Sequence, residues 1–134
     1  MDHPRTTASR RRELVFGAGG PEACNAGITW ARQALADWHF VDDGDALLVA
    51  AELLTNAVRH GGGILRLTLR HDRDRFRIAV ADPSPSVPHL GPHRPDTVGG
   101  HGIFIVDHIA QRWGSRLEGT GKTVWADLDV PPRA

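Results

Sequence analysis

The chain has 134 residues, a length typical of one domain with its own hydrophobic core. Its 16 basic and 16 acidic residues give a net charge of zero, which argues against nucleic acid or an anionic membrane as a partner and favours a small molecule or a protein. Cys24 is the only cysteine, so no disulfide can form within the chain, and no apolar segment resembles a signal peptide or a membrane span. We therefore expect a cytoplasmic protein.

The first part of the chain combines a polar tail, a short strand and a helix. Residues 1–12 are predicted to be a disordered tail, followed by one domain over residues 13–130 and a short tail at 131–134. A short strand is expected at Leu14–Phe16, and Pro21 begins a helix at the position that proline favours. An amphipathic helix is indicated by apolar residues at steps of three and four: Cys24, Ile28, Ala31, Leu35 and Trp38.

A second helix carries two strongly polar side chains in the apolar run Ala46–Val58. Glu52 and Asn56 are four residues apart, so their side chains lie on the same helix face. A base and a neutral oxygen donor one turn apart suit a hydrated divalent cation with an attacking group beside it. The alternative is that Glu52 faces solvent and Asn56 is only a residue near the helix end, since the helix stops at the glycines 61–63.

A hairpin follows, and its second strand ends in a carboxylate. Ile64–Leu69 and Phe76–Asp82 are predicted strands joined by a charged turn. Asp82 stands at the strand end beside hydroxyl residues such as Ser84, where a buried carboxylate could accept a hydrogen bond from an exocyclic amine such as that of adenine. The alternative is an aspartate that merely begins a turn, as aspartate before proline often does.

A proline-rich segment and a glycine cluster precede the third predicted helix. Pro83–Pro95 contains five prolines and is expected to be a loop of about fifteen residues, long enough to act as a lid. Gly99, Gly100 and Gly102 come directly before the helix expected at Ile103–Trp113, where unpaired backbone N–H groups suit a phosphate. The alternative is that these glycines are only a hinge for the loop.

Two more strands end the domain. They are expected at Ser115–Glu118 and Thr123–Val130, with glycines at the turn between them. The sequence contains no internal repeat and no domain linker. The order of elements therefore predicts one domain that combines helices with a sheet.

Four segments in this order resemble a known superfamily. They read ELLTNAVRHGG, VADPSPSVP, GGHGIFIV and GKTVWADL. Together they resemble the GHKL (Bergerat-fold) nucleotide-binding domain shared by gyrase, the Hsp90 chaperones, histidine kinases and MutL, and more closely the compact histidine-kinase-like ATPase domains of actinobacteria that are related to anti-sigma-factor serine kinases. The resemblance covers about residues 13–129. It implies an α/β (α+β) two-layer sandwich, with a mixed, mostly antiparallel sheet covered on one face by about three helices.

The resemblance also implies roles for individual residues. Glu52 is similar to the catalytic carboxylate that polarises the attacking water or hydroxyl, and Asn56 to the Mg²⁺ ligand. Asp82 corresponds to the aspartate that receives the adenine amino group, and Thr123 to a hydroxyl residue that supports Asp82 and adenine. Arg59 and His60 match positions that approach phosphate or ribose, and Gly100, Gly102 and Ile103 match positions whose backbone amides line the phosphates. The other positions implied to bind nucleotide are Ser84, Gly99 and His101.

The function implied by the resemblance is regulatory. One form is an ATP-dependent and Mg²⁺-dependent serine/threonine protein kinase that phosphorylates a small anti-sigma-factor antagonist. The resemblance also allows a homodimer. The alternative is a non-catalytic module in which nucleotide alters the binding of a sigma factor or another regulator, and a third form would no longer bind nucleotide. The chain departs from the usual D-x-G-x-G at Asp82–Ser86. Since no helical region that could present a phosphoacceptor histidine precedes residue 13, a complete sensor kinase is not expected.

Overall fold

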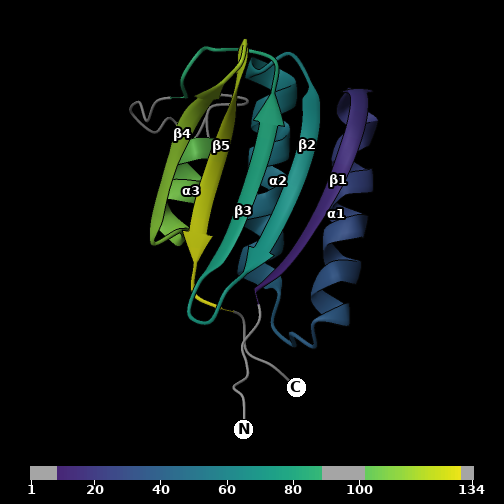
Figure 1. The fold of residues 1–134 in the computed structure, drawn as a ribbon, viewed down its shortest axis with the longest axis vertical. Coiled ribbons are helices and arrows are strands. Elements are labelled where there is room, and N and C mark those ends of the chain that lie inside the picture. Colours follow the sequence, from purple (N-terminus) through teal and green to yellow (C-terminus); the bar gives the residue numbers. More distant parts are fainter. Residues whose placement is uncertain (1–8, 89–101, 131–134) are drawn as a thin grey trace, which may run out of the picture.

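The fold is an antiparallel sheet with a layer of helices on one face. The computed structural model describes residues 9–88 and 102–130, which form five strands and three helices (Figure 1). The elements are β1 (Arg10–Gly19), α1 (Pro21–Asp37), α2 (Gly44–His60), β2 (Ile64–His71), β3 (Phe76–Asp82), α3 (Gly102–Ile109), β4 (Arg112–Glu118) and β5 (Gly121–Leu128). Within these residues, no helix has the length and apolar character needed to cross a membrane.

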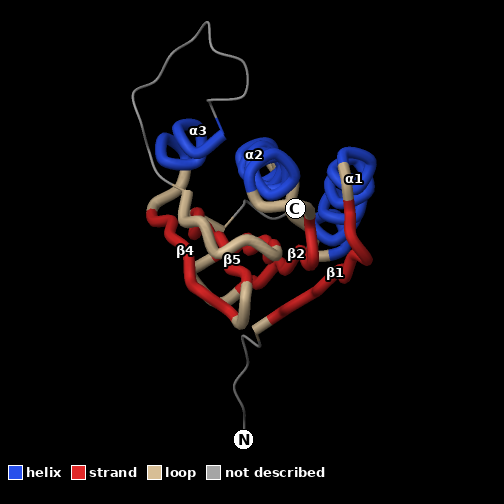
Figure 2. The backbone as a smooth tube through the Cα atoms, turned by 90° about the horizontal axis from the view of Figure 1, so that it is seen from above, coloured by secondary structure: helices blue, strands red, loops and turns tan. Residues whose placement is uncertain are grey.

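The strands lie in the order β1-β2-β3-β5-β4, and all three helices cover the same face of the sheet (Figure 2). The predicted two-layer α+β sandwich is confirmed. The expectation of a mixed sheet is wrong, because every pairing among the described strands is antiparallel. The connection from β1 to β2 contains two helices, which carry the chain along the sheet twice and let β2 run opposite to β1.

The hydrophobic core lies between the helices and the sheet. It is formed by alternate residues of the strands and by one face of each helix, as the two- and 3.6-residue periods require. Among the largest fully buried side chains are Leu35, Val49, Leu53, Phe76, Ile78 and Val80. Burying each such side chain stabilises the fold by about 1.5–3 kcal/mol, so this layer is the main source of stability.

Helices α1 and α2 pack closely because small residues line α1. The buried face of α1 consists of Ala23, Gly27, Ala31, Ala34 and Leu35. A Cβ at Gly27 would lie 2.9 Å from Cδ1 of Leu54 in α2, so a larger residue at this contact would require the Leu54 side chain to shift. The predicted apolar stripe is therefore displaced at its start, where Cys24 and Ile28 are only partly buried against the core.

Two predicted element boundaries are wrong. Strand β1 begins at Arg10, which pairs with His71, so residues 10–12 belong to the sheet and not to the tail. Helix α3 ends at Ile109, and Trp113 lies in β4, where it pairs with Ala126. In both places, pairing with a neighbouring strand decides the structure where the local sequence pattern did not.

Candidate functional site

Helix α2 presents Glu52 and Asn56 on the flank that faces α3. Leu54 contacts α1 at Gly27, and residue 54 lies about 200° around the helix from residue 52. Since α2 lies between α1 and α3, the side of α2 away from α1 faces α3 (Figure 2). Both Glu52 and Asn56 are half-buried. Both residues lie one turn apart within α2, so the predicted shared face is confirmed, and neither side chain is fully exposed.

The glycine triplet ends α2 beside the end of β3. The N–H groups of Gly61 and Gly63 both donate to the carbonyl of Ala57, at 2.9 and 3.0 Å. Gly62 and Gly63 have φ values of 82° and 125°, a backbone region that favours glycine. This turn leads the chain directly from α2 into β2, which pairs with β3 and so brings the end of α2 next to Asp82.

Asp82 is buried, and its two carboxylate oxygens have different surroundings. Asp82 is only 2% exposed. Oδ1 accepts a hydrogen bond from the Ser84 N–H at 2.9 Å and another from Lys122 Nζ at 3.0 Å. Oδ2 is buried and has no hydrogen-bond partner among the described residues. Because an unpaired buried acceptor costs about 1–3 kcal/mol, Oδ2 is suited to receive one N–H donor from a ligand.

Two glycines leave room for Asp82, one beside its carboxylate and one beside its backbone carbonyl. A Cβ at Gly61 would lie 2.5 Å from Asp82 Cγ and 2.6 Å from Oδ2. A Cβ at Gly121 would lie 2.1 Å from the Asp82 carbonyl oxygen. A larger residue at position 61 would displace the Asp82 carboxylate, and one at position 121 would require the backbone at Asp82 to shift. The first glycine of the triplet and the glycine before Lys122 thus have a role at the site as well as in a turn.

Lys122 is a site residue that the sequence interpretation missed. It is 2% exposed and its Nζ donates to Asp82 Oδ1 and, at 3.2 Å, to the carbonyl of Ser84. It therefore ties β5 both to the end of β3 and to the segment that follows. Lys122 is the only lysine in the chain, and it lies directly opposite Asp82 in the register of β3 and β5. That uniqueness was the one signal in the sequence that could have identified it.

Thr123 does not support Asp82, contrary to the expectation. It pairs with Ala81, so its side chain points to the opposite face of the sheet from Asp82. There its hydroxyl donates to Glu118 Oε1. Successive residues of a strand point to opposite faces of the sheet. In the register between β3 and β5, Lys122 pairs with Asp82, so Lys122 and not Thr123 points to the same face as Asp82.

The other predicted positions are distributed around the same end of α2. Ser84 is half-buried and its N–H holds Asp82, whereas Arg59 and His60 are exposed in the last turn of α2. Gly102 begins α3, and Ile103 is buried at 8% exposure. Gly99, Gly100 and His101, together with the rest of the expected lid after residue 88, lie outside the described residues.

The chain offers a divalent cation few ligands of its own. Within residues 9–88 and 102–130, no group of three or more His, Cys, Asp or Glu side chains could hold a metal ion. The half-buried Asn56 amide oxygen and the Glu52 carboxylate are the donors that α2 supplies on its α3-facing flank. This donor set fits Mg²⁺, which commonly takes one or two protein oxygens and completes its shell with phosphates and water.

Comparison with known proteins gives one result. Residues 21–128, most of the chain, match the family model described as the histidine kinase-like ATPase domain. This range runs from the start of α1 to the end of β5 and includes Glu52, Asn56 and Asp82. No curated protein matches the chain.

Proposed function

The chain belongs to the histidine kinase-like ATPase family, and from this membership we propose that it is a regulatory protein kinase that binds ATP beside α2 and Asp82. The proposal is supported above all by the unpaired Oδ2 of Asp82. Adenine carries an exocyclic amino group that can donate to this oxygen, while guanine has a carbonyl at the same ring position and would be repelled by it. We therefore expect selectivity for adenine nucleotides.

The phosphates would lie along the α3-facing flank of α2. Asn56 would hold the Mg²⁺ that accompanies ATP, and the chemistry that such an ion would supply is neutralisation of phosphate charge. Arg59 and His60, one turn beyond Asn56, are exposed and can reach phosphate or ribose. The start of α3 carries the positive end of the helix dipole, which favours the same anion.

Glu52 is proposed as the general base. It would accept the proton of a serine or threonine hydroxyl on a small partner protein while that oxygen forms a bond to the γ-phosphorus. The bond between the γ-phosphorus and the bridging oxygen breaks, and ADP leaves with the electron pair. Phosphoryl transfer depends mainly on positioning and on stabilisation of charge, which a half-buried carboxylate beside a metal ligand can provide. The resemblance suggests an anti-sigma-factor antagonist as the partner that is phosphorylated.

Calorimetry with and without Mg²⁺ tests the nucleotide site. Asp82→Asn should weaken ATP binding by at least about tenfold and reduce the preference for ATP over GTP, because an amide can donate to guanine as well as accept from adenine. Asn56→Ala should weaken ATP binding only when Mg²⁺ is present. Asp74→Asn, in the exposed β2–β3 turn, is the matched control and should leave both affinities unchanged. If Asp82→Asn and Asn56→Ala both bind ATP like the wild type, the assigned site is wrong.

A second test separates catalysis from binding. With labelled ATP and a candidate partner, Glu52→Gln should keep ATP affinity but lose on the order of a hundredfold or more in the rate of transfer, as expected for loss of a general base. Transfer by Glu52→Gln at the wild-type rate would exclude Glu52 as the base. ATP binding without transfer to any partner would count against a kinase.

One observation favours a second candidate, a nucleotide-dependent binding switch. Lys122 connects Asp82 with the carbonyl of Ser84, at the start of the segment that leads into the proline-rich loop. Adenine bound at Asp82 would contact the pair Asp82 and Lys122, which also holds this segment through the Ser84 carbonyl. Nucleotide binding would thereby change the position of the segment and the affinity of the protein for a partner such as a sigma factor. The switch predicts that Glu52→Gln retains nucleotide-dependent partner binding, measured by comparing partner affinity with ATP, with ADP and without nucleotide.

A further inference from the structure

The sheet face that points away from the helices, which we call the open face, carries side chains in regular rows. Directly opposed residues in antiparallel strands point to the same face, so the pairing register defines each row. The row we call the basic row consists of Arg11, Arg70, Arg77, Asp127 and Arg112. The central row consists of Glu13, Thr68, Ala79, Trp125 and Gly114. The third row consists of Val15, Arg66, Ala81, Thr123 and Arg116.

Small side chains in the middle of these rows leave a hollow on the open face. Its volume is about 220 Å³, and Ala79 and Ala81 line it together with Thr68 and Thr123. Arginines from both outer rows stand around these small residues. The open face is therefore not flat. The hollow runs across the strands, with arginines of the basic row on one side and arginines of the third row on the other.

Trp125 continues the central row toward β4 because Gly114 has no side chain. A Cβ at Gly114 would lie 2.9 Å from Cζ2 of Trp125, so the indole lies directly over this glycine. The Arg77 guanidinium stacks on the indole at 4.2 Å from the ring centroid, and it also donates to Asp127 Oδ1 at 2.6 Å. These contacts hold the ring in one orientation beside Arg77, which lines the hollow. We call the hollow and the arginines around it the groove.

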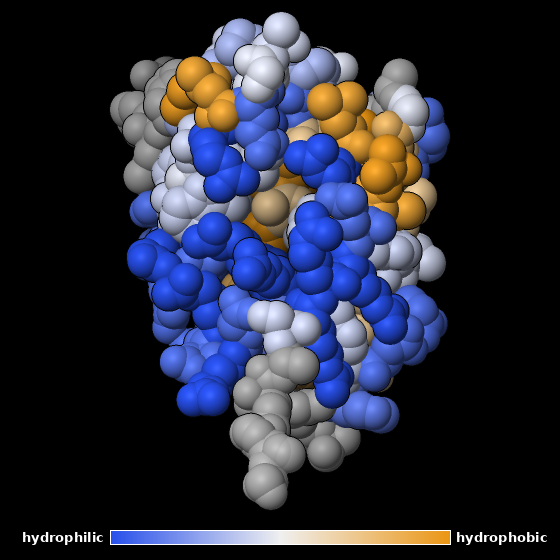
Figure 3. Space-filling view, viewed as in Figure 1, coloured by the Kyte–Doolittle hydropathy of each residue, from blue (hydrophilic) through white to orange (hydrophobic). Residues whose placement is uncertain are grey.

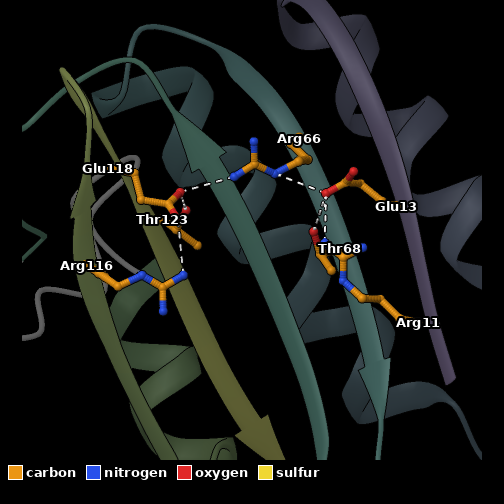
Figure 4. Close-up of polar contacts among 7 residues, drawn as sticks. All are labelled: Arg11, Glu13, Arg66, Thr68, Arg116, Glu118 and Thr123. Atoms are coloured by element: carbon orange, nitrogen blue, oxygen red, sulfur yellow. Dashed lines mark hydrogen bonds and ion pairs between the residues drawn. The ribbon is translucent and has the colours of Figure 1, made fainter. Parts of the chain in front are cut away.

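The groove has an excess of positive charge. Its lining includes five arginines, at positions 11, 66, 70, 77 and 116, against the two glutamates Glu13 and Glu118. Beyond the lining, Asp127 pairs with Arg77 and with Arg112, and Asp72 lies 3.7 Å from Arg70. Each glutamate is already shared: Arg66 lies 3.2 Å from Glu13 Oε2 and 3.1 Å from Glu118 Oε1, and Arg116 lies 3.1 Å from Glu118 Oε2 (Figure 4). Each guanidinium has five N–H donors, so these contacts leave donors directed at solvent.

The surroundings of the groove favour a protein over a nucleic acid. The whole chain has no net charge, so it lacks the long-range attraction that a polyanion normally requires. Val15, in the third row, is 71% exposed, and Figure 3 shows apolar atoms along the upper margin of this otherwise hydrophilic face. Apolar side chains beside a basic groove match a protein segment that has both acidic and apolar residues. Two copies of this chain meeting at the open face would bring together two surfaces that are both rich in arginine.

We propose that the open face binds a short, acidic, extended segment of a protein partner laid across the strands. Five strands about 4.8 Å apart give a width of about 19 Å, which about six extended residues of 3.3 Å each would span. Glutamate or aspartate side chains of the segment meet the arginines of the basic row, and an apolar side chain rests beside Val15. This surface lies on the opposite side of the sheet from Asp82 and is independent of the proposed nucleotide site.

Fluorescence anisotropy with a labelled peptide of about eight alternating glutamates and leucines tests the proposal. Arg70→Glu changes a side chain that is 54% exposed and should weaken binding by at least about tenfold. Arg32→Glu, on the exposed side of α1, makes the same change of charge on the helix layer and should alter the affinity less than about twofold. A peptide with glutamine in place of glutamate should not bind measurably.

Ala79→Arg distinguishes the groove from general charge attraction. This change adds a positive charge but fills the hollow, so binding should weaken, whereas attraction by charge alone would make it stronger. Circular dichroism confirms that the variant is folded. The proposal is overturned by tighter binding to Ala79→Arg, by equal losses in Arg70→Glu and Arg32→Glu, or by no peptide binding up to about 1 mM. A single-stranded oligonucleotide that binds more tightly than the peptide, or self-association that Arg70→Glu abolishes, would also overturn it.

Discussion

Asp82 shows how one carboxylate can combine a structural and a recognition role. Oδ1 is held by Lys122 and by the Ser84 N–H, so the side chain is fixed by strand β5 and by its own turn. Oδ2 has no partner in the described part of the chain. A buried ion pair contributes little net stability compared with apolar residues, but it fixes geometry when both partners are present. The cation thus orients the oxygen that a ligand would use.

Replacing Lys122 by methionine should destabilise the protein strongly. The change removes one partner of a buried pair and leaves the Asp82 carboxylate without its cation, which costs about 3–5 kcal/mol. Urea denaturation measures the loss as a lower midpoint with an unchanged slope.

The double variant Lys122→Met, Asp82→Asn is the control for that prediction. It removes both charges and should recover most of the lost stability, because the penalty comes from the unpaired charge and not from the missing side chain. A single variant as stable as the wild type would show that the ion pair does not hold this end of the sheet.

At the scale of elements, the site depends on how closely the end of α2 approaches β3. Gly61 forms the contact, and its φ of −106° and ψ of −4° are open to any residue, so the reason for glycine is the available space. Gly61→Ala should destabilise the protein by about 1–3 kcal/mol through overpacking and should also weaken ATP binding, since the added methyl group would displace Oδ2. Thermal denaturation and calorimetry measure the two effects.

Gly44→Ala is the matched control at the other end of α2. The nearest atom to a Cβ there is 3.7 Å away, an ordinary contact, so this variant should keep both stability and ATP affinity. Alanine at position 61 with wild-type affinity would mean that the space beside Oδ2 is not used by the ligand.

The sequence predicted most elements but not all of their boundaries. The long amphipathic runs of α1 and α2 and the alternation of β2 and β3 each follow one clear period, so they could be recognised locally. The apolar run Ile103–Trp113 fits either a helix or a strand, and pairing of Arg112 and Trp113 with β5 divides it between α3 and β4. Likewise, β1 extends back to Arg10 through pairing with β2, which no local pattern of polar residues reveals.

At the scale of the whole molecule, three separate carboxyl groups should lower the free energy of unfolding at acid pH. The hydrogen bond from Arg12 lowers the pKa of Asp37, and the hydrogen bond from Thr123 lowers the pKa of Glu118. Burial raises the pKa of Asp127, but hydrogen bonds from Arg77 and Arg112 outweigh it, and the pKa is lowered. A lowered pKa in the folded state means that the stabilisation is present above the unfolded pKa of about 4 and is lost as pH falls below it.

Urea denaturation at several pH values checks this dependence. The midpoint should change little between pH 7 and pH 5 and fall steeply below about pH 4. Asp127→Asn should be less stable at pH 7, because this 1%-exposed carboxylate pairs with arginines from β3 and β4, but its further loss in acid should be smaller. Asp74→Asn, in the exposed turn, should follow the wild-type curve. Equal acid sensitivity of wild type and Asp127→Asn would contradict the prediction.

The site could be predicted from the order of its motifs along the chain more than from any single motif. Glu52 with Asn56, and then Asp82 at a strand end, follow from helix and strand periods alone. The structure has the first two in α2 and Asp82 at the end of β3, beside the glycine that ends α2. The choice between Lys122 and Thr123 could not be made in the same way. It depends on the register between two strands whose alignment is set by the whole sheet, and a slip of one residue exchanges the two faces.

Because Lys122 is buried, its chemical reactivity reports how often this end of the sheet opens. An amine-reactive ester acylates a lysine only where solvent reaches it, and this lysine is 2% exposed and has no other lysine to compete with it. Acylation of Lys122 therefore requires β5 to separate from Asp82. Mass spectrometry would follow it in the peptide that contains Lys122, separately from acylation of the chain's α-amino group. The rate of labelling measures how often this end of the sheet opens, and its slowing by a nucleotide would measure how far the ligand keeps it closed.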